Sequence, residues 1–466
     1  MRFLEKIGLV SLGLVAGVSA SLHFAAIAEK ETFATPLPVE ELRAFTEVFG
    51  RIKSDYVEPV TDKKLITEAI TGMLNGLDPH SAYLDADAFK ELQVGTHGEF
   101  GGLGIVVSME DGLVKVVSPI EDTPADNAGI KSGDLIIKLD ETLVKGMTLE
   151  DAVKRMRGKP GSKLTLTITR KDVSRLLTFT LTRAIIKVQS VKSKLSEPGY
   201  GFVRITQFQE KTGEHLASAL EKLYEQNQGD LKGLVLDLRN DPGGLLTGAV
   251  AVSAAFLPKD ALVVYTEGRT DSAKMSLTAS PQNYLRGGAG SDYIQNIPDA
   301  VRAVPMVVLV NGGSASASEI VAGALQDHKR AVIMGSQTFG KGSVQTILPL
   351  GSNTAIKLTT ARYYTPKGRS IQAKGIEPDI FVEDPTSSNG SNGFHLREAD
   401  LNKHLSNGKP SEDEATDNND KSKLSIPDNS NGDMENPTRV EFGSKGDYQL
   451  IQALNLLKGM QILQGK

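Results

Sequence analysis

The sequence predicts a multidomain α/β protein in which a helical N-terminal segment and a β-rich module precede an α/β layered core. The chain has 466 residues, more than one ordinary hydrophobic core accommodates, so two or three domains are expected. The spacing of apolar residues also changes along the chain, from helical periodicity, to short strands, to strands that alternate with helices. A polar stretch near the C-terminus then separates the core from a final helix.

The first 28 residues have the pattern of an export signal. Arg2 and Lys6 precede an apolar run over 7–28, and the small residues at 26–28 fit a cleavage site. The run is also long enough to cross a bilayer, so a retained membrane anchor is the alternative. Either way, the rest of the chain is expected in the periplasm, free or anchored to the outer face of the inner membrane.

Residues 39–94 predict a helical region, and residues 95–184 predict a compact β-rich domain with one helix over 149–156. Within that domain, three glycines lie just before the first strand. Glycine allows consecutive backbone N–H groups to turn inward and bind an anion, such as the terminal carboxylate of a peptide paired with the strand edge. A glycine-rich hairpin without a ligand is the alternative.

Residues 185–383 predict the α/β layered core. Segments 233–239 and 306–310 are nearly continuous apolar strands, as a buried parallel sheet requires, and each leads through a glycine turn into a helix. Residues 384–440 are rich in Ser, Asn, Asp, Gly and Lys and predict a disordered linker. Within the C-terminal helix region 441–466, the apolar spacing over 447–463 predicts an amphipathic helix, and such a helix more often packs against a protein surface than performs chemistry.

Composition excludes several classes of function. The chain contains no cysteine, which rules out thiol catalysis, disulfides and thiolate metal sites. Its net charge is −5 and it has no long basic run, so nucleic-acid binding is not supported. We therefore expect no nucleic-acid partner. A serine and a lysine together can hydrolyse an amide without a metal, so we expect no metal and no cofactor either.

A cluster of serines marks the start of the helix that follows the second core strand. Ser314, Ser316 and Ser318 lie there, where helix N–H groups and the helix dipole stabilise an alkoxide or an oxyanion. Ser316 and Glu319 also have the spacing of a capping box, which is an ordinary structural role. Local sequence does not decide which serine would be the nucleophile.

Lys341 is the best candidate for the base that such a serine needs. None of the seven histidines lies in a recognisable catalytic-triad context. A free lysine has a pKa of about 10.4, so desolvation must lower it to roughly 7–8 before it can act as a base at neutral pH. The glycines on both sides of Lys341 and the nearby Phe339 suit that environment.

Three further residues or turns complete the candidate site. Gln345 could hold the lysine amine, although on an ideal strand the two residues start about 13 Å apart, so the loop must bend. An oxyanion hole needs two donors. The N–H of Ala317 is one candidate, and Gly243 or Gly244 in the other glycine turn is the second.

Residues 118–125 (Ser-Pro-Ile-Glu-Asp-Thr-Pro-Ala), residues 128–136 (Ala-Gly-Ile-Lys-Ser-Gly-Asp-Leu-Ile) and the helix after Met147 resemble a PDZ domain. This resemblance covers the whole β-rich module. It implies that free C-termini with apolar last residues bind there. The residues implied are those of the glycine loop, namely Gly101, Gly102, Leu103, Gly104 and Ile105.

The core resembles the C-terminal processing peptidases, or tail-specific proteases. The segments that carry this likeness are 236–244 (Leu-Asp-Leu-Arg-Asn-Asp-Pro-Gly-Gly), 313–325, 339–345, 77–81 (Leu-Asp-Pro-His-Ser) and 359–366. The resemblance implies a serine endopeptidase that cleaves proteins near their C-termini.

The same resemblance assigns roles to individual residues. It implies Ser316 as the nucleophile, Lys341 as the general base and Gln345 as the partner of the lysine; of the glycine pair we choose Gly243. Asp241 departs from the family pattern, which usually has asparagine there. The family also implies that the PDZ domain gates the site, with Arg157 as a candidate participant. A homo-oligomer and a periplasmic adaptor protein are the further partners that we expect.

Two other functions are compatible with part of the sequence. The spacing of Gly335, Gly340 and Lys341 matches most of a nucleotide-binding P-loop, but Gly342 stands where a serine or threonine should bind Mg²⁺. An exported protein also meets little ATP. A non-catalytic PDZ adaptor is the second alternative, but it would not require Lys341 or Gln345.

Overall fold

The structure is a computed structural model, and it describes residues 38–463 and 465 except 111, 121, 172, 188, 286–291, 352, 384–396 and 408–441. The predicted export signal or anchor over 1–28 therefore lies outside the described residues, as does most of the predicted linker over 384–440. Among the described helices, none combines the length and the apolar character that crossing a membrane requires.

The N-terminal region is helical, as predicted. Helix α2 (Val39–Asp55) and most of α3 (Asp62–Asn75) belong to a compact unit that ends at Ile70. No residue of α2 is buried, so its apolar stripe is exposed. The stripe consists of Leu42, Phe45, Val48 and Ile52.

The second unit begins with the short strand β1 (Ala82–Leu84), helix α4 (Ala86–His97) and the β-rich domain. The alternating apolar residues of the predicted strands form one buried core together with Ala152 and Met156 of α6 (Leu149–Met156). Its sheet has the order β3-β4-β5-β7-β8, with β6 paired to β5. These elements are β3 (Ile105–Glu110), β4 (Leu113–Pro119), α5 (Pro124–Asn127), β5 (Leu135–Leu139), β6 (Thr142–Leu143), β7 (Lys163–Arg170) and β8 (Val173–Thr182), and β2 (Glu99–Gly102) pairs with β9 (Ala184–Lys187) outside it.

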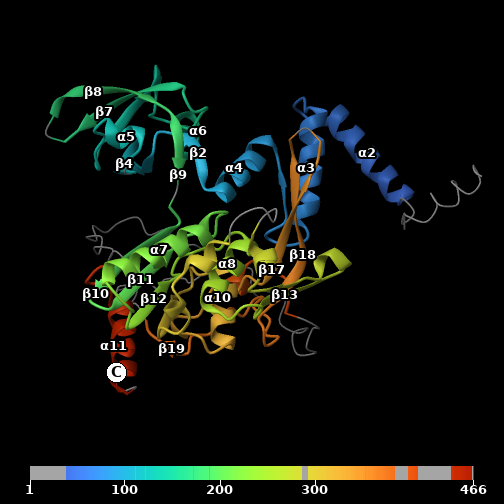
Figure 1. Ribbon diagram of the computed structural model, residues 1–466. Helices are drawn as coiled ribbons and strands as arrows, with labels where there is room; N and C mark the ends of the chain where they lie inside the picture. The colour runs from blue at the N-terminus through green and yellow to red at the C-terminus, as the bar shows by residue number, and fades with distance from the viewer. Residues whose placement is uncertain are drawn as a thin grey trace, which may run out of the picture. The chain divides into compact units, whose positions relative to one another are not determined.

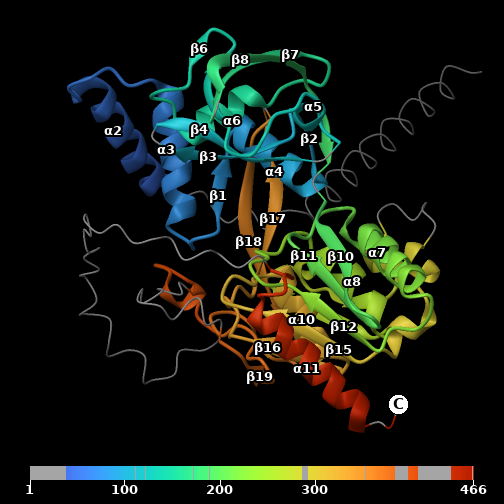
Figure 2. The ribbon, with the colours of Figure 1, turned by 90° about the vertical axis from the view of Figure 1, so that its left-hand side faces the viewer.

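The α/β core is built on a second sheet with the order β10-β11-β12-β15-β16-β19. Every neighbouring pair from β11 onward is parallel. Helices α7, α8 and α10 pack on one face, and α11 packs on the other (Figures 1 and 2). The elements are β10 (Val191–Glu197), β11 (Tyr200–Ile205), α7 (Thr212–Asn227), β12 (Gly233–Asp237), α8 (Leu246–Phe256), β15 (Met306–Val310), α10 (Ala317–Asp327), β16 (Val332–Gly335), β19 (Ile380–Phe381) and α11 (Tyr448–Leu463).

Strands β12 and β15 explain where the site forms. Both are buried along their whole length, which agrees with their continuous apolar sequences. They are parallel neighbours, so the turns after them emerge at the same edge of the sheet. The N–H of Ala315 in one turn donates to the carbonyl of Asp241 in the other over 3.0 Å.

The turn that contains Lys341 leads directly into a smaller antiparallel sheet. Strand β17 (Ser343–Pro349) follows Lys341 and pairs with β18 (Ala355–Tyr364). The remaining strands of this sheet are β1, β13 (Leu262–Gly268) and β14 (Ser276–Thr278).

The prediction of a disordered linker over 384–440 is wrong for residues 397–407. This 397–407 segment contains a short 3₁₀ helix, Glu398–Asp400, and the Glu398 side chain is buried. The prediction used the average composition of the whole stretch, and an average does not show that one short segment forms polar contacts with the core. The C-terminal helix predicted over 447–463 is confirmed, since α11 runs over Tyr448–Leu463.

Candidate active site

Ser316 lies in the sharp turn between β15 and α10. Its backbone has φ 56° and ψ −112°, a strained conformation for a residue with a side chain. The N–H of Ser316 donates to Oε2 of Glu319 over 2.8 Å, so the turn is held in this shape. The side chain is half-buried at the N-terminus of α10, where the helix N–H groups favour negative charge.

Long-range hydrogen bonds distinguish the three serines. Ser314 is fully buried, and its hydroxyl donates to the carbonyl of Leu238 over 2.8 Å. Ser318 is also fully buried, and its hydroxyl donates to the carbonyl of Asp241 over 2.9 Å. Both hydroxyls therefore tie α10 and its leading turn to the turn after β12. The hydroxyl of Ser316, in contrast, is not held by a backbone carbonyl of that turn, and its side-chain hydrogen bond is with Tyr363.

Glu319 joins the turn of Ser316 to the turn of Lys341. Its side chain is fully buried, and beside Ser316 it accepts hydrogen bonds from Thr338 Oγ1 (2.6 Å), Gly340 N (2.7 Å) and Lys341 N (2.9 Å). Burial raises the pKa of Glu319 to about 7, although these donors favour the ionised form. The capping-box spacing was visible in the sequence, but the three long-range donors were not.

The surroundings of Lys341 shift its pKa in the direction that a lysine base needs. Burial lowers the pKa of Lys341, and repulsion from Lys357 adds to this, while Glu398, Glu319 and Asp78 act in the opposite direction. Its backbone is fixed, because the Tyr363 hydroxyl donates to the Lys341 carbonyl. Between the described residues Ser316 and Lys341, no hydrogen bond joins Oγ to Nζ.

Tyr363 is a member of the site that sequence reasoning missed. Burial raises the pKa of Tyr363 well above its usual value, against the effect of a side-chain hydrogen bond with Ser316. The phenol therefore stays neutral and contacts both Ser316 and the backbone of Lys341. The sequence signal that could have found Tyr363 is the alternation along β18, which places this side chain on the buried face of the strand.

Gln345 does not contact the lysine amine in this structure. Its Nε2 donates to Ser343 Oγ over 3.0 Å and to Thr359 Oγ1 over 3.3 Å. Thr359 in turn donates to Asp78 Oδ1 over 3.1 Å. The role of Gln345 as the partner of Lys341 therefore stays a prediction.

The turn after β12 lies against the nucleophile. Gly243 has φ 96°, and a Cβ there would lie 2.8 Å from both Ala317 N and Ser316 Cβ, so only glycine fits. Ala317 is the first residue of α10, and its N–H has no partner within the helix. The N–H of Gly243, however, donates to Oδ1 of Asp241 over 2.9 Å, so this predicted oxyanion donor is already engaged.

Asp241 is a buried carboxyl group beside these donors. Burial raises the pKa of Asp241 to about 7. Its Oδ2 has no hydrogen-bond partner among the described residues. The family's usual asparagine would carry no charge here, so the departure noted in the sequence has an electrostatic consequence.

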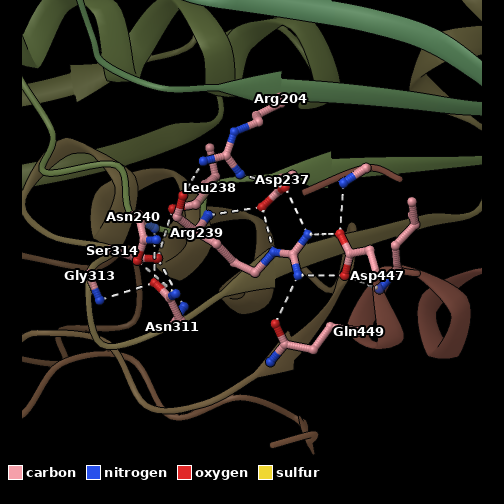
Figure 3. Close-up of polar contacts among 12 residues, drawn as sticks. Arg204, Asp237, Leu238, Arg239, Asn240, Asn311, Gly313, Ser314, Asp447 and Gln449 are labelled. Carbon is pink, nitrogen blue, oxygen red and sulfur yellow. Dashed lines mark hydrogen bonds and ion pairs between the residues drawn. The ribbon is translucent and has the colours of Figure 1, made fainter. Parts of the chain in front are cut away.

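A buried ion-pair network fixes the strand end that leads to this turn (Figure 3). Arg239 pairs with Asp237 and with Asp447, which lies just before α11, at 2.9 and 2.6 Å. Asn240 and Asn311 then link the two turns, because Asn240 N donates to Asn311 Oδ1 and Asn311 Nδ2 donates to Asn240 Oδ1, both over 2.9 Å. The C-terminal segment thus anchors the framework of the site.

The glycine loop of the β-rich domain borders a separate cavity of about 210 Å³. Gly102, Leu103, Gly104 and Ile105 line it as predicted, whereas Gly101 does not. The carbonyl of Gly101 accepts the N–H of Gly158 instead, and a Cβ on Gly101 would lie 2.1 Å from the Gly158 carbonyl oxygen. The other lining residues are Phe100, Val107, Val153, Met156 and Arg157, of which Arg157 lies over the Phe100 ring at 5.0 Å.

A larger cavity of about 870 Å³ lies beside the start of β15 and the end of α11, and it contains no residue of the candidate site. Among the described residues, no group of three or more His, Asp or Glu side chains is arranged to hold a metal ion.

Comparison with known families finds three matching regions. Residues 199–382 match Peptidase family S41, residues 101–182 match the PDZ domain, and residues 18–88 match the activating protease CtpB N-terminal domain.

Individual relatives agree with these matches. A carboxy-terminal-processing protease of Bartonella bacilliformis is 45% identical over 423 residues, which cover 90% of this chain and 89% of the relative. The carboxy-terminal processing protease CtpA of Bacillus subtilis is 35% identical over 340 residues, covering 73% of this chain and 68% of the relative. Among solved structures, a photosystem II D1 C-terminal processing protease matches with 31% identity and a TM-score of 0.42, covering 73% of this chain and 86% of that one.

Proposed function

The chain belongs to the carboxy-terminal-processing serine proteases of peptidase family S41, and we propose that it cleaves peptide bonds with a dyad of Ser316 and Lys341. The observation that carries this proposal is the contrast among the serines, because Ser314 and Ser318 are held by carbonyl groups while Ser316 is not. The lowered pKa of Lys341, caused first by burial, supports its role as the base.

In the proposed mechanism, neutral Lys341 accepts the proton of Ser316 as Oγ attacks the scissile carbonyl carbon. The oxyanion that forms lies at the N-terminus of α10, near the N–H of Ala317. Protonated Lys341 then donates its proton to the leaving amine, and an acyl-enzyme remains. Lys341 next takes a proton from a water molecule as that water attacks the ester carbonyl, and it then gives this proton to Ser316 Oγ as the acyl group leaves, which restores both residues.

Substrate binding must complete this arrangement. No hydrogen bond joins Ser316 and Lys341 in the described residues, and catalytic hydrogen bonds often shorten only when substrate binds. A second oxyanion donor at Gly243 likewise requires that its N–H leave Asp241 Oδ1. Because Nε2 of Gln345 already donates to Ser343, its Oε1 is the atom that would hold the lysine amine.

We also propose that the PDZ domain binds the C-termini of protein substrates. The terminal carboxylate would meet the backbone N–H groups near Gly102 and Gly104, and an apolar last side chain would enter the cavity of about 210 Å³. Arg157 lies at that cavity and is the candidate that would couple an occupied PDZ domain to the protease core.

Export to the periplasm is the proposed location, with the segment 1–28 acting as a signal or as an anchor on the inner membrane. The exposed apolar stripe on α2 supports a homo-oligomer, and an adaptor protein is a second candidate partner. No cofactor is part of the proposal.

A cleavage assay tests the dyad. The substrate is a protein with an apolar C-terminus, and wild type is compared with Ser316→Ala and Lys341→Ala at matched concentration. We expect both variants to lose cleavage while their melting temperatures stay close to that of wild type. Cleavage at the wild-type rate by either variant would refute the dyad, and the same assay with a C-terminally amidated substrate tests recognition of the carboxylate.

A further inference from the structure

The 397–407 segment lies against the core next to the turn of Lys341, between two stretches outside the described residues. Its backbone contacts that turn directly, because Glu398 N donates to the carbonyl of Phe339 over 3.1 Å. Arg397 Nη2 also donates to the carbonyl of Lys374 over 2.9 Å, and Arg362 Nη2 donates to the carbonyl of Ser406 over 3.0 Å. Contacts at both ends thus hold the segment in place.

The Glu398 carboxylate occupies a polar site inside the core. Its side chain is 1% exposed, and the His80 ring Nε2 lies 2.8 Å from Oε2 and 3.0 Å from Oε1. Gln372 Nε2 donates to Oε1 over 2.9 Å. Burial opposes ionisation, but the hydrogen bonds from His80 and Gln372 hold the pKa of Glu398 below its usual value. A buried carboxylate so well satisfied is unusual in a stretch with the composition of a linker.

Glu398 is connected to the residues on either side of Lys341 once through its carboxylate and once through its backbone N–H. Gln372, which Glu398 orients, accepts the N–H of Gly342 at its Oε1 over 3.0 Å. The N–H of Glu398 holds Phe339 on the other side. The turn of Lys341 is therefore fixed by Glu319 from α10 and by Glu398 from the C-terminal stretch.

We propose that Glu398 is a positioning residue for the general base, which places the C-terminal 397–407 segment in the active-site framework. This inference rests on the proposed role of Lys341. Glu398 acts by holding the backbone at Phe339 and Gly342 and by placing a negative charge near the lysine amine. It touches neither the substrate nor Ser316.

The charges that face Lys341 come from several elements. Lys357 on β18 favours the neutral amine, whereas Glu398, Glu319 on α10 and Asp78 before β1 favour the protonated amine. Removal of the Glu398 charge alone therefore lowers the pKa of Lys341. Because a general base must be neutral, the ascending limb of the pH–rate profile then moves to lower pH.

Two substitutions separate position from charge. Glu398→Ala removes the contacts with His80 and Gln372, and we expect kcat to fall by about tenfold, a fraction of the 10²–10⁴-fold that a general base contributes, with KM unchanged. Glu398→Gln keeps the length of the side chain and removes the charge, and we expect the ascending limb of kcat/KM to move to lower pH. Asp400→Asn is the matched control, since Asp400 is exposed and an asparagine oxygen there still accepts the N–H of Arg397, so the charge is removed and we expect both quantities to stay unchanged.

The rate at which an organofluorophosphonate probe labels Ser316 gives a second measurement, which needs no peptide substrate. The same shift of its pH profile in Glu398→Gln supports the proposal. A wild-type kcat in Glu398→Ala together with a wild-type profile in Glu398→Gln overturns it, as does a change in KM alone. Full activity of Lys341→Ala would instead refute the dyad, so the two failures are distinguishable.

Discussion

The turn of Ser316 and the turn of Lys341 are held in different ways. In the first turn the backbone is strained at Ser316, and neighbouring side chains and carbonyls fix it on both sides. In the second turn the backbone is held equally well by Glu319 and Tyr363, but no hydrogen bond joins the described lysine amine to Ser316. The framework is thus formed in advance, and one lysine side chain is left to complete the dyad.

The largest expected effect tests the first turn. Ser316→Ala removes the nucleophile, and we expect activity to fall by roughly 10³-fold or more. Ser318→Ala removes one buried hydrogen bond worth about 1 kcal/mol, so we expect activity within about tenfold of wild type and a small loss of stability. Cleavage rates and thermal melting measure both. The reverse order of activities would show that the wrong serine was chosen.

Glu319→Gln tests the connection between the turns. An amide nitrogen in place of one carboxylate oxygen would face N–H donors, so the two turns lose their mutual position. We expect kcat to fall by up to about 10²-fold, the size of effect that follows from a misplacement of about 1 Å. Glu319→Asp, which keeps the charge but shortens the side chain, is the comparison variant, and wild-type kcat in both would contradict the role of Glu319.

Asp241→Asn tests the turn beside the nucleophile through pH. The pKa of Asp241 is raised to about 7 by burial, so the stability that the protonated form contributes is present below about pH 4 and is lost as pH rises through about 7. One pKa unit corresponds to about 1.4 kcal/mol, so the loss amounts to up to roughly 4 kcal/mol.

Asparagine at position 241 cannot ionise. We therefore expect Asp241→Asn to melt at a higher temperature than wild type at pH 8.5, with a smaller difference at pH 5. Melting curves at both values provide the measurement. An equal difference between the two proteins at both pH values would show that Asp241 does not titrate in this range.

The smallest expected effect concerns the charge around the lysine. Lys357 repels the protonated amine and lowers the pKa of Lys341, so Lys357→Met should raise that pKa. We expect the ascending limb of the pH–rate profile to move to higher pH by less than about one unit, opposite to the shift in Glu398→Gln. A shift of both variants in the same direction would rule out an electrostatic cause.

Much of the fold was predictable because it depends on local spacing. The continuous apolar sequences of β12 and β15 predicted buried parallel strands, and parallel neighbours bring their following turns together. The helices α6, α8 and α11 were likewise predicted, close to their observed bounds. The prediction of a disordered linker was wrong at 397–407 because composition describes an average. The position of this segment instead depends on hydrogen bonds between Glu398 and three partners distant in sequence.

The sequence alone determined the candidate chemistry, because the residue types and their spacing limit what a serine, a lysine and a glycine turn can do. Local chemistry did not decide which of three serines is the nucleophile. The spacing of Ser316 and Glu319 also fits an ordinary helix capping box. The tertiary structure distinguished the serines, since the carbonyls that hold Ser314 and Ser318 lie 76 and 77 residues away. It likewise placed Glu319, Tyr363 and Glu398 around Lys341, because hydrogen bonds and burial are set by neighbours in space, which no local pattern specifies.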